Sequence, residues 1–283
     1  MKSPARLFAG AAALCASLAY PAEIDRSGGP YVPSPSTVVE AMLKHANVGP
    51  QDFVIDLGSG DGRIVLTAVT RFKAGGGIGV DIDEELVDRA NASAKKQGVD
   101  DRVRFIRQDV READLSRATV LTLYLLPGMM SVLRTKLLAE LRPGTRIVSH
   151  DFVFEQWKPD RSVTIETQEK YDMTGIWTSD VHLWIVPAPV QGAWRGRWSG
   201  RQGGEFQLDI RQGFQFFDAQ FARNGRAVEV NDGQVSGAKV SFTVPGENGR
   251  RERYSATVGR DQMNGEVRDG ETVVARWSAA RVP

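Results

Sequence analysis

Residues 53–63 read Phe53-Val54-Ile55-Asp56-Leu57-Gly58-Ser59-Gly60-Asp61-Gly62-Arg63, an apolar run that breaks into a glycine-rich turn. The mostly apolar residues 53–57 predict a short buried strand. The glycines allow the backbone of the turn to approach a ligand closely. A helical pattern follows over 63–72, and the free N–H groups at its start favour an anionic group such as a carboxylate. The stretch therefore predicts a strand, a ligand-binding turn and a helix.

Strands and helices continue to alternate after this turn. Further strands are predicted at 77–81, 102–106, 119–125 and 145–149, and helices at 83–96, with Asp83 as its cap, and at 129–141. A helix over 37–46, capped by Ser36, precedes them. Apolar strands joined through helices predict an α/β fold, a parallel sheet covered on both faces. After His150, strands at 163–168 and 181–186, joined by a loop that contains Trp177, are expected as an antiparallel pair.

The residues after Pro187-Ala188-Pro189 have a different pattern. Short alternating apolar segments are separated by Gly and Asn at roughly ten-residue spacing. They include 206–210, 214–216, 228–230, 240–244, 254–258 and 273–277. This pattern predicts a C-terminal all-β domain, a small barrel or a sandwich, over 188–283, after an α/β domain over 23–187.

The N-terminus predicts export. Lys2 and Arg6 precede an apolar run over 7–18, and Ser17-Leu18-Ala19 offers small residues for cleavage. This is the pattern of a secretory signal peptide, which we predict over residues 1–22, with the periplasm or cell envelope as destination. The alternatives are an uncleaved membrane-associated segment and a misassigned start codon, which would leave the protein membrane-associated or cytoplasmic.

Composition narrows the function classes. The formal net charge of the 283 residues is +1, so no nucleic-acid partner is expected. Cys15 is the only cysteine and lies inside the predicted signal peptide, so no disulfide partner and no thiol nucleophile are expected. The three histidines, His45, His150 and His182, are scattered without a metal-binding spacing, and we expect no metal site.

Acidic residues follow the second and third predicted strands. Asp81 stands where a carboxylate accepts hydrogen bonds from ribose hydroxyls, and Asp109 stands where an acid can face an adenine amino group. The glycine spacing is GxGxG, and Arg63 replaces the third glycine of the dinucleotide fingerprint. Ligands of open α/β sheets bind at the carboxyl ends of the strands. The expected cofactor-binding residues are Tyr31, Asp56, Gly58, Ser59, Gly60, Asp61, Gly62, Asp81, Ile82, Asp109 and Val110.

Residues from about 31 to 186 resemble class I S-adenosylmethionine (SAM) methyltransferases. The motif D-L-G-S-G-D-G-R, with residues 31–35 upstream and 123–127 at the fourth strand, is similar to one family in particular. These are the protein-lysine methyltransferases of the mitochondrial adenine nucleotide translocase and the ATP synthase c-subunit, with their bacterial relatives. The resemblance implies a Rossmann-like seven-stranded sheet, SAM as cofactor, and a protein substrate, with a membrane protein as one option. Three features do not fit this family. They are the C-terminal domain, the predicted signal peptide, and Ala118-Thr119, which stand where such enzymes often carry an acid.

The resemblance also implies where the chemistry occurs. Tyr124, at the end of the fourth strand, is the expected substrate-pocket residue, and Tyr31 is expected to fold over the cofactor. His150 and Asp151 are candidates for proton handling. Three hypotheses stay open: methylation of a protein lysine, methylation of a small molecule, and SAM or nucleoside binding without turnover. A pocket closed by the Tyr31 segment would favour a small molecule, and an open groove beside Tyr124 would favour a protein.

Overall fold

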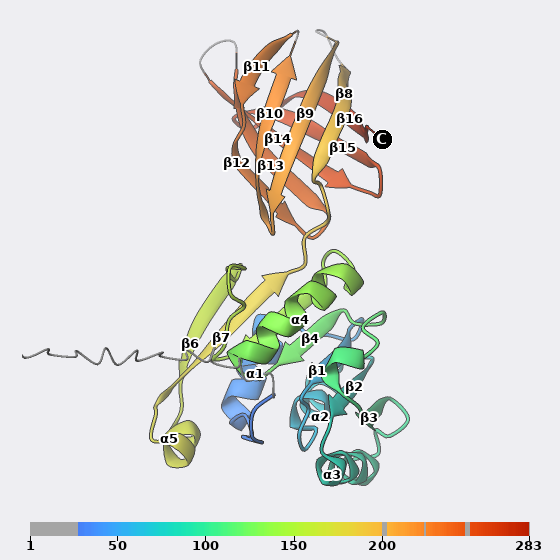
Figure 1. Ribbon diagram of the computed structural model, residues 1–283, viewed down its shortest axis with the longest axis vertical. Helices are drawn as coiled ribbons and strands as arrows, with labels where there is room; N and C mark the ends of the chain where they lie inside the picture. The colour runs from blue at the N-terminus through green and yellow to red at the C-terminus, as the bar shows by residue number, and fades with distance from the viewer. Residues whose placement is uncertain (1–27, 200–202, 224, 247–249, 283) are drawn as a thin grey trace, which may run out of the picture.

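The computed structural model describes residues 28–199, 203–223, 225–246 and 250–282. The predicted signal peptide, with Cys15, lies outside these ranges. The described residues form two sheets joined end to end, a seven-stranded sheet and a nine-stranded sheet (Figure 1). The predicted boundary at 187/188 falls between the last strand of the first sheet and the first strand of the second. No helix within the described ranges is long and apolar enough to cross a membrane.

The first sheet has the order β3-β2-β1-β4-β5-β7-β6. Its strands are β1 (Phe53–Leu57), β2 (Gly76–Asp81), β3 (Val103–Arg107), β4 (Val120–Leu123), β5 (Arg146–His150), β6 (Arg161–Glu166) and β7 (Thr178–Ile185). Strands β1 to β5 are parallel, whereas β7 runs antiparallel between β5 and β6. This confirms the Rossmann-like sheet that the sequence predicts.

Helices cover both faces of this sheet. They are α1 (Ser36–His45), α2 (Arg63–Thr70), α3 (Glu84–Lys96), α4 (Pro127–Glu140), α5 (Gln168–Thr174) and the 3-10 turn η1 (Val110–Glu112). Successive strand residues point to opposite faces. Val54 and Val120 therefore pack with α1, α2 and α3, whereas Ile55 and Leu121 pack with α4.

Two local predictions were wrong. Ser36 does not cap α1 but is its first residue, because its N–H and its hydroxyl both donate to Glu169 Oε2 at 2.8 Å. The segment between β6 and β7 is not only a loop, since it contains α5. Within α5 only Lys170 is buried, so the segment carries no apolar periodicity that could have predicted a helix.

The second sheet closes into a barrel. Its strands are β8 (Gly192–Ser199), β9 (Gly204–Gly213), β10 (Phe216–Arg223), β11 (Arg226–Glu229), β12 (Asn231–Ser236), β13 (Lys239–Pro245), β14 (Arg251–Val258), β15 (Gln262–Asp269) and β16 (Thr272–Arg281). Pairing of β9 with β10 closes a ring, to which β11 is attached through β10. Buried aromatic side chains fill the interior, among them Trp194, Phe206, Phe221, Phe242, Tyr254 and Trp277. The domain is thus a barrel and not a sandwich.

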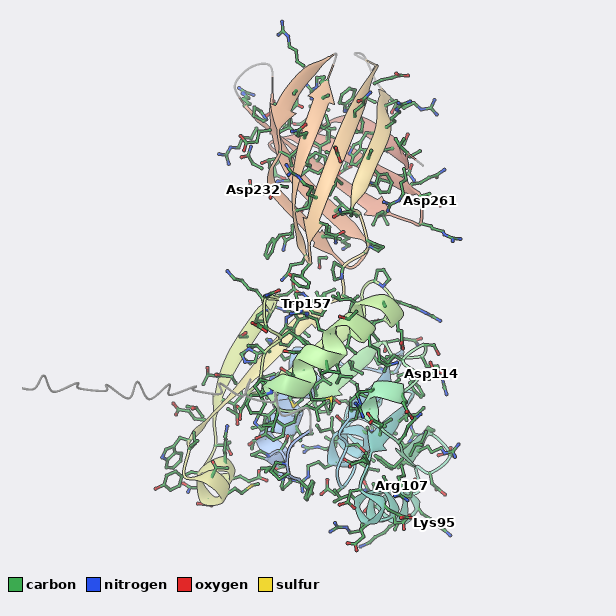
Figure 2. The ribbon with its side chains drawn as sticks, viewed as in Figure 1. Lys95, Arg107, Asp114, Trp157, Asp232 and Asp261 are labelled. Carbon is green, nitrogen blue, oxygen red and sulfur yellow. The ribbon has the colours of Figure 1, made fainter. Side chains whose placement is uncertain are left out.

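The barrel contacts the first domain through a small set of specific interactions. The rings of Trp157 and Phe214 stack at a centroid distance of 5.7 Å, and Figure 2 shows Trp157 at the junction. Gln215, which is buried, donates from Nε2 to the carbonyl of Lys158 at 2.7 Å. These contacts tie the barrel to the edge of the first domain away from α5 (Figure 1).

Candidate functional site

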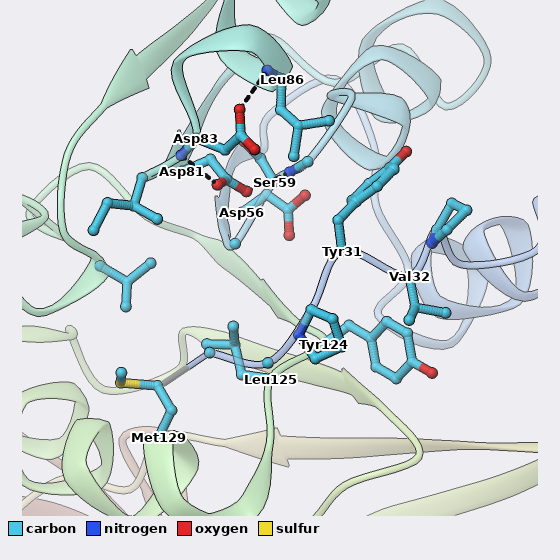
Figure 3. Close-up of a pocket in the computed structure, with 18 of the residues that line it drawn as sticks. Tyr31, Val32, Asp56, Ser59, Asp81, Asp83, Leu86, Tyr124, Leu125 and Met129 are labelled. Carbon is cyan, nitrogen blue, oxygen red and sulfur yellow. Dashed lines mark hydrogen bonds between the residues drawn. The ribbon is translucent and has the colours of Figure 1, made fainter. Parts of the chain in front are cut away.

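A cavity of about 720 Å³ opens at the carboxyl ends of β1, β2 and β4 (Figure 3). Of the thirteen residues predicted for the site, all but Gly62 and His150 line it. The predicted residues that line the cavity are Tyr31, Asp56, Gly58, Ser59, Gly60, Asp61, Asp81, Ile82, Asp109, Val110 and Tyr124. Segments far apart in the sequence therefore converge where parallel strands end.

The turn after β1 has a backbone that requires glycine. Gly58, Gly60 and Gly62 have φ angles of +81°, +52° and +80°. A Cβ at Gly58 would lie 2.7 Å from Leu125 Cδ2, and one at Gly62 would lie 2.5 Å from Phe105 Cζ. Gly62 thus allows α2 to pack closely against the sheet, a structural role beside the cavity.

Asp81 fixes the turn from the neighbouring strand. Its Oδ2 accepts the Gly60 N–H at 2.7 Å and its Oδ1 accepts the Asp83 N–H at 3.0 Å. Asp83 in turn caps α3 by accepting the Leu86 N–H at 3.1 Å, as predicted. A carboxylate oxygen can accept more than one hydrogen bond, so Asp81 retains acceptor capacity for ligand hydroxyls.

Asp56 lies buried at the end of β1. Its Oδ1 accepts the Thr122 hydroxyl at 2.6 Å, but within the described residues its Oδ2 has no hydrogen-bond partner, and neither has the buried Ser59 hydroxyl. Burial raises the pKa of Asp56 to about 7 against the opposing Thr122 hydrogen bond, and the charges of Asp81 and Asp61 add to the rise. Buried polar atoms are nearly always satisfied, and a ligand that carries donors, such as a cationic amine, would supply a partner for Asp56 Oδ2.

The segment before α1 folds over the glycine turn. The Tyr31 ring lies so close to Gly60 that a Cβ there would be 2.5 Å from Tyr31 Cε2. Arg63 holds the segment by donating to the Ser34 carbonyl at 2.9 Å and to Asp61 Oδ2 at 2.7 Å. Burial favours a higher pKa for Asp61, but the hydrogen bonds and charge of Arg63 outweigh it and lower that pKa. Tyr31 itself remains 47% exposed, so the segment covers the turn without sealing the cavity.

Asp109 stands at the rim where η1 begins. Its carboxylate accepts the Arg111 N–H at 2.8 Å and forms an ion pair with the Arg111 guanidinium. The hydrogen bond from the Arg111 side chain lowers the pKa of Asp109, which outweighs a small effect of burial. Asp109 is therefore an ionised acceptor, already shared with Arg111, next to Val110 in the cavity wall.

Tyr124 follows β4 and stacks on His150, with ring centroids 3.9 Å apart. His150 is 1% exposed, and its two ring nitrogens hydrogen-bond the hydroxyls of Ser34 and Ser179, each at 2.9 Å. Burial lowers the pKa of His150 to about 4 although the charge of Asp151 opposes this. His150 is thus neutral and lies behind Tyr124, outside the cavity lining.

The predicted proton-handling role of His150 and Asp151 finds no support in this geometry. Neither is among the described residues that line the cavity, and Asp151 binds Lys170 Nζ at 2.7 Å. The apolar wall of the cavity was not predicted. That wall includes Ile64, Leu86, Leu125, Leu126, Met129 and Phe152. The rule that ligands bind at strand ends could have indicated Leu125 and Leu126, which follow β4 closely.

Several known proteins are similar to the first domain. The sequence model of a protein family, the ANTKMT methyltransferase domain, matches residues 56–161. A protein-lysine N-methyltransferase of Saccharolobus islandicus is 43% identical over 137 residues, which cover 48% of this chain and 85% of the relative. The ATP synthase c-subunit lysine N-methyltransferase of Xenopus laevis is 33% identical over 147 residues, 51% of this chain and 63% of the relative. This chain thus spans less than two thirds of the length of the Xenopus protein.

A solved structure is similar as well. The RNA methyltransferase from Salinibacter ruber, crystallised with S-adenosyl-L-homocysteine, is 44% identical. The match covers 56% of this chain and 96% of the other, with a TM-score of 0.50. The similarities therefore agree on methyl transfer, while the names of the relatives differ in the methyl acceptor.

Proposed function

Because this chain belongs to the family of SAM-dependent protein-lysine methyltransferases, we propose that it transfers the methyl group of SAM to a lysine side chain of a protein. The archaeal relative, of which the chain covers 85%, is named a protein-lysine N-methyltransferase. The resemblance seen in the D-L-G-S-G-D-G-R motif is confirmed, and so is SAM as the cofactor. The structural observation that contributes most is that Asp56 and Ser59 line the cavity, and that Asp56 Oδ2 and Ser59 Oγ have no hydrogen-bond partner among the described residues.

The residues around the cavity fit SAM. Asp56 and Ser59 would receive its amino group, and the turn at the start of α2 would receive its carboxylate. Asp81 would accept hydrogen bonds from the ribose hydroxyls, and Asp109 would face the adenine. The Tyr31 segment would cover the methionine moiety. Five aspartates, Asp56, Asp61, Asp81, Asp83 and Asp109, line the cavity against two arginines, Arg63 and Arg111, a balance that suits a cationic ligand.

The bound cofactor supplies an electrophilic methyl group on a positively charged sulfur. The lone pair of the acceptor lysine Nζ would form the new N–C bond as the C–S bond breaks, with sulfur keeping the electron pair of that bond. The nitrogen must first lose a proton to water. The protein's part is to align the amine, and Tyr124 stands at the cavity wall on a rigid support, the buried His150. Burial raises the pKa of Tyr124, as does Asp151, so its neutral hydroxyl serves as a hydrogen-bond acceptor for the amine.

Replacement of Tyr124 by Phe is expected to lower kcat about tenfold to thirtyfold, with SAM affinity unchanged. The substitution keeps the ring that stacks on His150 and removes only the hydroxyl. Methyl transfer from radiolabelled SAM, measured at several acceptor concentrations, separates kcat from KM. Tyr31→Phe serves as the matched control, since it also removes one phenolic hydroxyl at the cavity. Equal kcat in Tyr124→Phe and the unsubstituted chain would show that the Tyr124 hydroxyl does not contribute to methyl transfer.

The methyl acceptor is tested directly. The full chain is incubated with methyl-labelled SAM and, separately, with protein, RNA and small-molecule fractions of the producing cells. Methyllysine in hydrolysed protein supports the proposal. Label in RNA nucleosides, the acceptor class of the similar Salinibacter enzyme, or in small molecules contradicts it. Binding of SAM with no label in any fraction favours a binding protein without turnover.

We also propose that residues 1–22 direct the chain out of the cytoplasm, on the signal-peptide pattern of the sequence. In that case the methyl acceptor would be a protein of the cell envelope. Removal of these residues is expected to move the expressed chain from the envelope fraction to the cytoplasm, which fractionation of cells with either form measures. Equal distribution of the two forms would contradict the proposal.

A further inference from the structure

Residues 171–178, which we call the α5 tip, expose an apolar surface. Tyr171, Met173, Ile176 and Trp177 are between 42% and 56% exposed. The rings of Tyr171 and Trp177 stack on each other at a centroid distance of 4.5 Å and an interplanar angle of 20°. The stacked pair of Tyr171 and Trp177 is thus exposed, with two further exposed apolar side chains in the same short segment, and exposed apolar surface of this kind marks interaction sites.

The α5 tip is held in place by its own backbone. The Gly175 N–H donates to the Tyr171 carbonyl at 2.8 Å, and Gly175 adopts a φ of +74° that ends the helix. The Thr167 N–H donates to the Trp177 carbonyl at 3.0 Å, where β6 pairs with β7. The exposed rings are therefore presented on a defined scaffold, which reduces the entropy lost when a partner binds.

Two contacts connect α5 to the rim of the cavity. Lys170, which is buried, binds Asp151 Oδ2 at 2.7 Å, and Asp151 precedes Phe152 in the cavity wall. Glu169 accepts two hydrogen bonds from Ser36, close in sequence to Ser34, which also lines the cavity. Figure 1 shows α5 at the end of the molecule opposite the barrel, beside α1. The start of α5 thus contacts neighbours of the cavity wall, in which Phe152 stacks on Tyr124.

The exposed charged residues of the segment that carries the tip are acidic. Between residues 162 and 181 the acidic residues are Glu166, Glu169, Asp172 and Asp180, and the single basic residue, Lys170, is buried against Asp151. Such a surface attracts a basic segment and repels polyanions, which include RNA and anionic lipid headgroups.

We propose that the α5 tip is the docking surface for the acceptor, a protein segment with apolar residues and basic charge around its target lysine. This rests on the proposed lysine methylation. The apolar residues of the segment would cover Tyr171 and Trp177, and the basic residues would face Asp172 and Asp180. The tip thereby contributes to the choice of substrate, outside the cofactor cavity.

The test is a binding measurement that requires no methyl transfer. The probe is a short fluorescein-labelled peptide with a central lysine, flanking leucines and an arginine at each end. Its Kd for the full chain is measured by anisotropy in the presence of S-adenosylhomocysteine. Trp177→Ala and Asp172→Lys are each expected to raise the Kd about tenfold or more, whereas Val274→Ala, at an equally exposed apolar position on the barrel, leaves it unchanged. Calorimetry is expected to show the same SAM affinity in all variants.

The outcomes separate this proposal from the proposed function. Peptide affinity that is equal in Trp177→Ala, in the milder Trp177→Phe and in the unsubstituted chain overturns the docking surface, even if lysine methylation is observed. Trp177-dependent binding of the peptide supports the surface even when no methyllysine forms, a result that refutes only the reaction. Binding of polyuridylate or phosphatidylglycerol vesicles through Trp177, without peptide binding, overturns the proposal, and so does Trp177-dependent self-association in sedimentation.

Discussion

Replacement of Asp81 by Ala is expected to weaken SAM binding by about 100-fold or more. We expect the carboxylate to accept hydrogen bonds from the ribose hydroxyls, and it accepts the Gly60 N–H that shapes the turn. Hydrogen bonds to a charged group contribute about 1.5–3 kcal/mol each, so the loss of one of them already reaches tenfold. Calorimetric titration of the full chain with SAM and with S-adenosylhomocysteine measures the change, which is expected for both ligands.

Two control variants assign the cause. Asp81→Asn keeps an oxygen that can accept the Gly60 N–H but loses the charge and one acceptor, so an intermediate affinity is expected. Asp83→Ala removes the cap of α3, which costs about 1 kcal/mol of stability and leaves the ribose acceptor intact. Unchanged affinity in Asp81→Ala would refute the placement of the ribose beside this residue.

The order of elements could be predicted because each strand of the first sheet has a local sequence pattern. Strands buried on both faces are continuous apolar runs, and a single glycine turn fixes the direction of the chain between β1 and α2. The short helix α5 could not be predicted, because its one buried residue is Lys170 and burial of an ion pair leaves no apolar period. Closure of the barrel rests on the pairing of β9 with β10, whereas local alternation is the same in a barrel and a sandwich.

In the site, too, some features could be predicted from the local sequence and others could not. The aspartates at 56, 81 and 109 were predicted because the carboxyl ends of parallel strands meet at one edge. The role of His150 depends on the hydroxyls of Ser34 and Ser179, and these contacts join three distant parts of the chain. A strand-end histidine suggests a proton carrier, but the neutral, buried ring instead supports Tyr124. Tertiary contacts of this kind cannot be predicted from the spacing of residues along the sequence.

The buried carboxyl of Asp56 lowers the stability of the ligand-free protein, and the same carboxyl is expected to bind the cofactor. In the folded chain burial holds its pKa at about 7, above the ordinary value of 3.8. Between these two values the folded state keeps a proton that the unfolded state has lost. The contribution of Asp56 to stability is therefore greatest below pH of about 4 and is lost as the pH rises through about 7. The difference between the two pKa values corresponds to as much as about 4 kcal/mol.

Asp56→Asn is accordingly expected to stabilise the ligand-free protein at pH 8. An amide oxygen can still accept the Thr122 hydroxyl, while the NH₂ group that replaces Oδ2 stays unpartnered at a cost of about 1–3 kcal/mol. The net gain at pH 8 is about 2 kcal/mol, or a rise in Tm of about 5 °C, and it vanishes at pH of about 4.5, where the native carboxyl is protonated. Thermal unfolding of the full chain by circular dichroism at both pH values measures this.

Addition of SAM is expected to reverse the order of the two proteins at pH 8. In the unsubstituted chain we expect an ionised Asp56 to pair with the amino group of the cofactor, which would lower the pKa of the carboxyl. In Asp56→Asn an amide donor faces that amino group, itself a donor, so the variant binds SAM more weakly. Ligand binding adds stability in proportion to the logarithm of affinity, and the unsubstituted chain therefore gains more.

Asp100→Asn separates this effect from a general change in charge. Asp100 is an exposed carboxylate outside the cavity lining, so its replacement is expected to leave the responses to pH and to SAM as they are in the unsubstituted chain. A Tm of Asp56→Asn that stays below that of the unsubstituted chain at pH 8 without SAM would show that the Asp56 carboxylate does not destabilise the free protein. If SAM then raised the Tm of both proteins equally, the cofactor amino group would lie elsewhere, because pairing with Asp56 requires the charge that the variant lacks.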